Sequence, residues 1–150
     1  MPNDDVITNL SEAFKGLFTN APEGVTNGLY DALQGRMYED EAESGAAYPY
    51  AVFSIISSPK DRTFTEVYRD SLLQLDLFSE IASGASVMKN IHYQASKLYD
   101  ECAMTITGST LIWCRETNFI KSIEDIETTT SGTSRVYHWI LEYDIRTSLN

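Results

Sequence analysis

The closing part of the chain alternates apolar and polar positions. Apolar side chains stand at every second residue, at Tyr137, Trp139, Leu141, Tyr143 and Ile145, and the residues between them are mostly charged or polar. Successive side chains of a β-strand point to opposite faces of the sheet. The pattern therefore predicts a strand with one buried face and one exposed face.

Earlier segments also have strand patterns. The run 51–57 is rich in β-branched residues and follows Pro49, which stands at the strand entrance where its missing N–H costs least. Within 63–79, the alternation predicts an apolar face formed by Val67, Ser71, Leu73, Leu75 and Leu77, with Tyr68, Asp70, Gln74 and Asp76 opposite. The segment 110–121 predicts a strand in which Leu111 and Trp113 lie opposite Ile112 and Cys114. Residues 36–38 predict a short strand, and 124–134 a polar hairpin tip.

Helical spacing occurs in two longer segments. A first helix is expected over about 5–18, with an apolar stripe of Val6, Leu10, Phe14 and Leu17. A short helical turn over 26–33 ends before Gly35. The main helix has its stripe at Val87, Ile91, Ala95, Leu98 and Cys102.

The order of these segments predicts an α+β fold. We expect a mostly antiparallel, twisted sheet of four or more strands, with the long amphipathic helix packed on one face and an additional N-terminal helix. Residues 1–150 are of ordinary length for a single domain, with the core over about 25–147.

The net charge of the chain restricts the kinds of molecule that it can bind. The chain has 22 acidic and 11 basic residues, for a net charge of -11. Nucleic-acid backbones bind clustered lysine and arginine, so this surface should repel DNA. Residues 1–50 hold nine acids and two bases, giving -7 for that part. The simplest interpretation is an acidic, solvated end.

Cysteines and hydropathy indicate a cytoplasmic site of synthesis. Cys102 and Cys114 are too few for a disulfide framework in a chain of this length, so both are interpreted as reduced, buried thiols. The first residues are acidic where a signal peptide is basic, and no apolar run approaches the length of about 18 residues that a membrane span needs.

No set of residues predicts catalysis or metal binding. Gly-x-Ser-x-Gly and the phosphate-binding motifs are absent from the sequence, and the cysteines fall on structural positions. His138 shares a strand face with Glu142 and Asp144, but a solvated strand produces such a trio by alternation alone. We expect no catalytic residue, no cofactor and no metal site.

Two groups of residues are candidates for protein contacts. Residues 39–47 lack apolar periodicity and predict an exposed loop with four acids, Glu39, Asp40, Glu41 and Glu43, which do not match a calcium loop. Three aromatic residues on outer or edge positions, Tyr48, Tyr68 and Phe78, are suited to contacts between subunits.

Four segments resemble one family. Residues 29–38 (LYDALQGRMY) and 48–52 (YPYAV) are similar to the front half of the tail terminator and tail-completion proteins of long-tailed bacteriophages. Residues 72–79 (LLQLDLFS) and 135–137 (RVY) are similar to the back half. The resemblance covers about 25–147 and consists of element order, lengths and a Pro-Tyr strand entrance.

The resemblance implies a non-enzymatic virion protein, assembled in the host cytoplasm and placed at the head-proximal end of the tail. Such a protein forms a ring, commonly a hexamer, on the completed tail tube, stops tube polymerisation and receives the head-completion or connector proteins. Its partners are its own copies, the tail tube protein and those connectors, with no membrane. DNA passes through the lumen without specific binding. The acidic loop then faces the lumen or a docking surface.

Three alternatives stay open from the sequence. The chain could be another head–tail connector or minor tail protein of the same fold. It could be an acidic adaptor that binds a basic host protein, with strong salt dependence. An enzyme would need a site that no motif here predicts.

Overall fold

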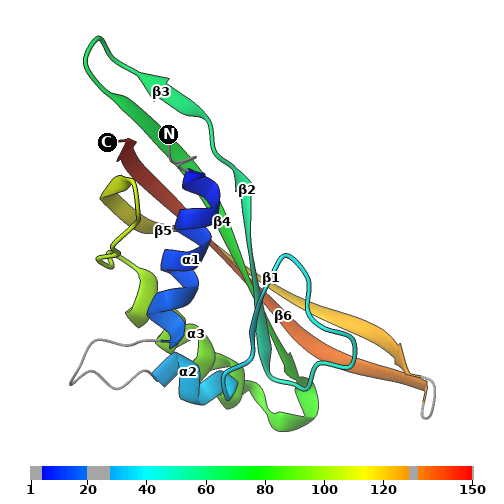
Figure 1. Cartoon of the computed structure of the whole chain (residues 1–150). Coiled ribbons are helices and arrows are strands. Elements are labelled where there is room, and N and C mark those ends of the chain that lie inside the picture. Colours follow the sequence, from blue (N-terminus) through cyan, green and yellow to red (C-terminus); the bar gives the residue numbers. More distant parts are fainter. Residues whose placement is uncertain (1–4, 20–27, 129–131, 150) are drawn as a thin grey trace.

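A single layer of helices lies on one side of a twisted sheet (Figure 1). The computed structural model describes residues 5–19, 28–128 and 132–149, with only the backbone for 126–128 and 132–134. The helices are α1 (Val6–Thr19), α2 (Gly28–Leu33) and α3 (Ala85–Tyr99), with a short 3₁₀ turn at Ile81–Ser83. The strands are β1 (Met37–Glu39), β2 (Tyr50–Ser57), β3 (Lys60–Arg62), β4 (Val67–Glu80), β5 (Ser109–Thr128) and β6 (Gly132–Leu149).

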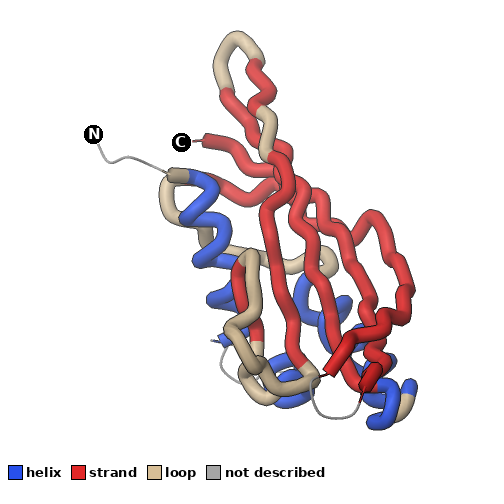
Figure 2. The backbone as a smooth tube through the Cα atoms, turned by 90° about the vertical axis from the view of Figure 1, so that its right-hand side faces the viewer, coloured by secondary structure: helices blue, strands red, loops and turns tan. Residues whose placement is uncertain are grey.

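The strand order is β1-β2-β4-β6-β5, and β3 pairs with the beginning of β4. The β1–β2 pair is parallel and the other pairs are antiparallel. The predicted α+β fold, with a mostly antiparallel sheet, a long helix on one face and an N-terminal helix, is confirmed. Figure 2 shows the strands fanning out in front of the helices.

The hairpin of β5 and β6 is longer than the sequence predicts. We expected a polar tip over 124–134, but β5 continues to Thr128 and β6 begins at Gly132. Backbone pairing runs down to Thr128 and Gly132. Serine and threonine are typical of turns, but threonine also favours strands, so this composition does not mark the end of a strand.

Side chains of β4 and β6 alternate as the sequence predicts. Leu73, Leu75 and Leu77 of β4 are fully buried, and so are Leu141 and Tyr143 of β6. The residues between them on each strand are only partly covered. One face, the inner face, therefore forms the core under the helices.

Strand β5 departs from simple alternation because its register shifts between Leu111 and Trp113. Leu111 packs against the core, whereas Trp113 lies on the opposite face and donates a hydrogen bond from Nε1 to Asp144 at 2.9 Å. The prediction that Leu111 and Trp113 share a face is wrong. Ile112 is the extra residue of a β-bulge, which adds one residue and so reverses the alternation.

Helix α1 begins at a side-chain cap. The Asp5 Oδ1 atom accepts hydrogen bonds from the backbone N–H groups of Ile7 and Thr8, each at 3.2 Å. These bonds satisfy donors that have no partner inside the helix. The predicted stripe is buried at Val6, Leu10 and Phe14, and is completed by Phe18, while Leu17 is only partly buried.

Helix α3 ends earlier than predicted. Its buried residues are Met88, Ile91, Ala95 and Tyr99. Asp100 leaves the helical conformation, and its carboxylate accepts a hydrogen bond from the Glu116 N–H at 2.9 Å. The next residue, Glu101, donates a hydrogen bond from its N–H to the Cys114 carbonyl at 2.8 Å. Cys102 therefore lies in the loop after the helix and not on its stripe, because contacts with β5 end the helix first.

Phe14 and Tyr99 join the two long helices over the sheet. Their rings stack with centroids 3.9 Å apart, and the Tyr99 hydroxyl donates to the Phe14 carbonyl at 3.0 Å. Both rings also approach Tyr143 of β6, at 6.3 and 5.9 Å between centroids. None of the helices described is long and apolar enough to cross a membrane.

Replacing Phe14 with alanine tests this contact. We expect Phe14→Ala to lower the free energy of unfolding by about 3–5 kcal/mol, because it removes a fully buried ring and leaves a cavity. Lys15→Ala is the matched control on the exposed side of the same helix and should change it by about 0.5 kcal/mol or less. Urea unfolding followed by circular dichroism measures both, and equal effects would contradict this account of the core.

Candidate assembly surface

The second face of the sheet, the outer face, is not covered by α1, α2 or α3 (Figure 2). It carries the alternate residues of β4 and β6, including Asp70, Asp76 and Phe78 on β4, and His138 and Arg146 on β6. These side chains are partly covered by one another but not by another layer. Polar and aromatic groups thus form a broad surface.

An aromatic row crosses one end of the outer face. The Tyr48 and Tyr50 rings lie 5.3 Å apart, Tyr50 and Phe78 stack at 4.8 Å, and Phe78 and His138 stack at 4.3 Å between centroids. Tyr38 of β1 meets Tyr50 edge-on at 6.0 Å. Partial burial in this row, with Tyr48 nearby, raises the pKa of Tyr50 to about 12. Aromatic surfaces of this kind are enriched in protein interfaces.

His138 ends the row between two carboxylates. Its Nδ1 atom is 2.6 Å from Glu124 Oε1, and its Nε2 atom is 3.2 Å from Asp76 Oδ2, an ion-pair distance without hydrogen-bond geometry. The Asp76 carboxylate raises the pKa of His138 above its ordinary value, partial burial opposes this, and Glu124 raises it further. When it is protonated, His138 links β4, β5 and β6 through these two carboxylates.

Arg146 organises the opposite end of the outer face. Its Nη1 atom donates to both Asp70 carboxylate oxygens at 2.9 Å, and its Nη2 atom donates to Asp61 at 3.1 Å. The guanidinium also lies over the Tyr68 ring, 4.4 Å from the centroid, and 5.5 Å from the Trp113 ring centroid. A positive charge shared between two carboxylates and two rings fixes β3, β4, β5 and β6 relative to one another.

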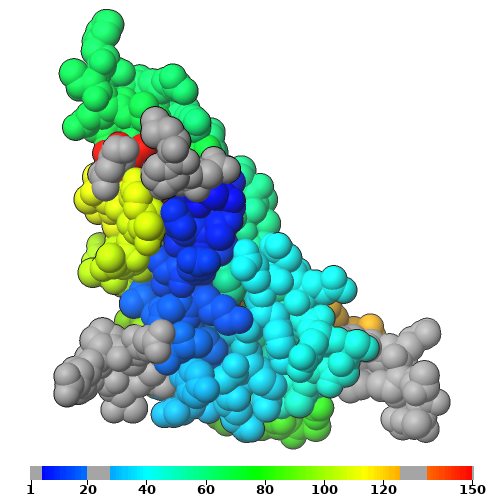
Figure 3. All heavy atoms as spheres, in the orientation of Figure 1, coloured from blue at the N-terminus to red at the C-terminus, as the bar shows by residue number. Residues whose placement is uncertain are grey.

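The acidic loop, residues 39–43, begins at Glu39, which is still the last residue of β1 at the edge of the sheet, so the loop expected over 39–47 starts one residue later. Glu39, Asp40, Glu41 and Glu43 are all exposed. Asp40 has a positive φ of 62° and its N–H donates to the Phe53 carbonyl at 2.8 Å, which fixes the start of the loop on β2. The Tyr38 hydroxyl donates to Glu43 at 3.3 Å. Figure 3 shows this loop, in cyan, on the surface beside α2.

Sequence reasoning found only part of this surface. Tyr48 and Phe78 do belong to one row, but Tyr50, which is not among the predicted contact residues, lies between them. Tyr68 is on the same face at its other end, against Arg146. The alternation in 63–79 assigned Asp70 and Asp76 to this face, yet their partners on β6 depend on strand register, which sequence alone does not give.

The described side chains include no group of three or more histidine, cysteine or acidic residues placed to hold a metal ion. His138 contacts Asp76 and Glu124 and makes no ion pair with Glu142 or Asp144, the residues that share its strand face. Neighbouring strands supply both partners from diagonal positions, because Phe78 and Ser122 are the residues paired with His138 and the two acids stand two residues away from them. Diagonal neighbours are within reach of long side chains.

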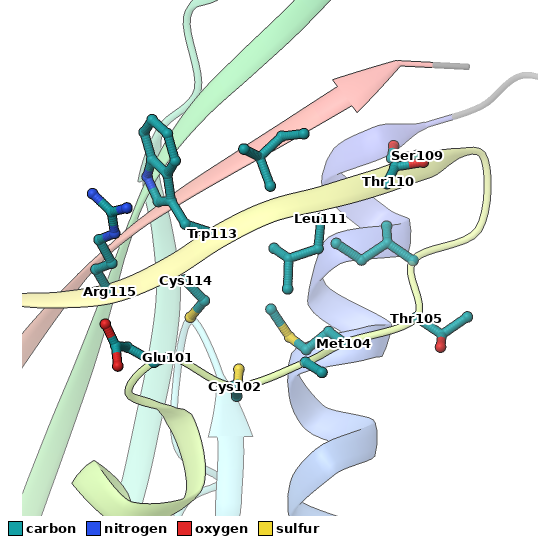
Figure 4. A pocket seen from close by; sticks show the side chains of 13 residues that line it. Glu101, Cys102, Met104, Thr105, Ser109, Thr110, Leu111, Trp113, Cys114 and Arg115 are labelled. Carbon is teal, nitrogen blue, oxygen red and sulfur yellow. The ribbon is translucent and has the colours of Figure 1, made fainter.

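The two cysteines line a cavity of about 550 Å³ between β5 and the loop after α3 (Figure 4). Both are free thiols, and the Cys114 Sγ lies 3.4 Å from the Tyr99 carbonyl oxygen. Met104, Ile106 and Leu111 complete an apolar wall. Neither histidine of the sequence lines this cavity, so the nearby base that activates a cysteine nucleophile is not supplied by histidine here.

The fold is thus an α+β sheet with helices on one face and an aromatic and charged outer face. The family model of tail completion protein gp17 matches residues 25–148. The chain therefore belongs to the tail completion protein gp17 family and is a structural phage tail protein. The resemblance seen in the sequence is confirmed.

A solved structure has a similar fold. A chain from the virion of a native gene transfer agent (GTA) particle aligns with a TM-score of 0.64 and 12% identity, over 95% of this chain and 98% of that chain. At this identity the likeness shows a shared fold. A second solved chain aligns at 15% identity over 92% of this chain and 94% of its own, but its TM-score of 0.48 supports no conclusion. No curated protein matches the sequence significantly.

The pH dependence of stability tests the His138 site. Since the pKa of His138 is raised above its ordinary value of 6.5, its protonation stabilises the folded state below about pH 6.5. That contribution is lost as the pH rises through the raised pKa. His138→Gln should remove this component, so the difference in free energy of unfolding between the two proteins should shrink with rising pH.

Urea unfolding at steps between about pH 5.5 and about pH 8.5 measures the difference. Asp76→Asn is the companion variant, because it removes the largest cause of the raised pKa and should shift the loss to lower pH. A difference that stays constant across this range would show that His138 does not titrate against these carboxylates.

Proposed function

We propose that this protein caps the end of the phage tail tube, stops tube polymerisation and provides the surface to which the head attaches. Membership of the tail completion family, matched over 25–148, carries the proposal. The outer face and the acidic loop supply two separate contact surfaces on one rigid sheet. In this mechanism the protein acts by covering the surface that a further tube subunit would use, and it transforms no substrate.

On the tail the copies form a ring, a hexamer, at the head-proximal end of the virion tail. A head-to-tail contact between identical subunits closes into a ring when the rotation between neighbours fits. One side of the ring contacts the tail tube protein and the other receives the head-completion or connector proteins. The net charge of -11 keeps the DNA that passes through the lumen from binding. Assembly takes place in the host cytoplasm.

The aromatic row and the Arg146 cluster are the contact regions that we assign to subunits and tube. Tyr and Arg are enriched in interfaces because they combine a large contact area with hydrogen bonding. Tyr48, Tyr68 and Phe78 supply aromatic contact area in these regions. Another connector or minor tail role would use the same surfaces, and the tail phenotype distinguishes it from capping.

Electron microscopy of tails from a phage that lacks this gene tests capping. We expect tubes of irregular length without heads, since nothing stops subunit addition at the open end. Supplying the wild-type chain from a plasmid is the control and should restore uniform, head-joined tails. Tails of normal length without heads would favour a connector role, and normal particles would refute both.

A further inference from the structure

A cleft opens between the beginning of α3 and the hairpin of β5 and β6. Its volume is about 460 Å³, and it is lined by Ala85, Lys89, Lys121, Ile123, Tyr137 and Trp139. The wall is mostly apolar, with half of the Ile123 side chain exposed. Two lysines, one from each side, are the charged groups of this cleft.

The charge of these lysines is not balanced within the described part of the chain. The Lys121 Nζ atom lies 4.7 Å from the Trp139 ring centroid and 5.9 Å from that of Phe119, so it is held over aromatic rings. Among the described residues, no carboxylate is within ion-pair distance of Lys89 or Lys121. A chain with twice as many acids as bases thus leaves two cations together on an apolar wall.

The N-terminus of α3 adds to this positive field. Gly84 occupies the N-cap position without a side chain that could accept a hydrogen bond, and the first turn contains no acidic residue. The first N–H groups of a helix carry a partial positive charge and favour carboxylates. Ala85, the first residue of α3, lines the cleft. The two lysines and the uncapped helix start therefore favour the same occupant, an acidic segment.

We propose that this cleft binds the acidic loop of a second copy of the chain. The loop presents four exposed carboxylates, and none of them forms an ion pair with a described residue of its own chain. Both halves of the contact are thus present on one molecule, each without an ion pair to a described residue. This inference rests on the proposed ring, and it assigns the loop to the subunit contact instead of the lumen.

The sheet topology fits a head-to-tail contact. The acidic loop follows β1, which forms one edge of the strand order, and the hairpin side of the cleft includes β5 at the other edge. Complementary patches on opposite edges let every subunit donate its loop to one neighbour and receive the loop of the other. Such a contact is heterologous, which is the kind that generates rings. If the acidic loop bound a basic partner protein instead, no acidic loop of a neighbouring copy would occupy the cleft.

A charge-swap experiment in the phage tests the pairing. In a phage that lacks the gene, plasmid-borne Lys89→Glu/Lys121→Glu should lower the yield of head-joined particles at least about tenfold, because like charges then face each other. Combining it with Glu39→Lys/Glu41→Lys should recover most of the yield. The matched control, Lys60→Glu/Lys97→Glu, makes the same change of net charge at exposed lysines outside the cleft and should retain nearly full yield.

The unmodified protein supplies a second, independent measurement. A carbodiimide joins lysines to carboxylates that are in contact, and mass spectrometry of treated tails made from a mixture of isotopically labelled and unlabelled chains identifies links between copies. We expect Lys89 or Lys121 linked to the acidic loop of a different copy. Links only within one copy, links to another protein, or no link at these residues would overturn the proposal, whether or not the charge-reversed variants fold.

The two proposals fail in different ways. If Lys89→Glu/Lys121→Glu supports normal tails while deletion of the gene still gives uncapped tubes, the loop-to-cleft contact is wrong and capping stands. If deletion leaves normal particles, capping is wrong. Loss of yield in the lysine variant without recovery in the combined variant also counts against the pairing, provided that both melt within a few degrees of wild type.

Discussion

The stack of Phe14 on Tyr99 is the contact on which the helix layer depends. It joins α1 to α3 directly above Tyr143, in the middle of the buried face of β6. A parallel ring contact adds to the free energy gained by burial, and the Tyr99 hydroxyl is satisfied by a backbone carbonyl. Because this cluster fixes both helices on the inner face, none of α1, α2 and α3 covers the outer face.

The buried core and the proposed contact surface therefore lie on the two faces of the same strands. In β4, leucines alternate with Gln74, Asp76 and Phe78, so each strand contributes to the core and to the surface. The outer face is not a loose polar surface, since His138 and Arg146 bind carboxylates from neighbouring strands. A surface fixed in this way loses little conformational entropy when a partner binds.

The sequence predicted elements and faces better than it predicted neighbours. Alternation alone assigned the leucines of β4 and the aromatic residues of β6 to the core, because successive side chains of a strand point to opposite faces of the sheet. Alternation failed at Trp113, where a bulge reverses the period, and helical spacing failed at Cys102, where contacts with β5 end the helix. Partners such as Asp76 and His138 depend on register across β4 and β6, which no local pattern contains. The acidic loop was visible from composition, but its position at the sheet edge needed the fold.

The twist of the sheet has a consequence for any assembly built from this subunit. Adjacent strands of twisted sheets rotate on average by about 20–25° relative to each other, and β1 and β5 are separated by four steps in the strand order, which corresponds to about 80–100° of accumulated twist. Neighbours that join at these two edges are therefore turned relative to each other about the line that crosses the strands. Closure of the proposed ring then depends on the angle set at each joint together with this turn.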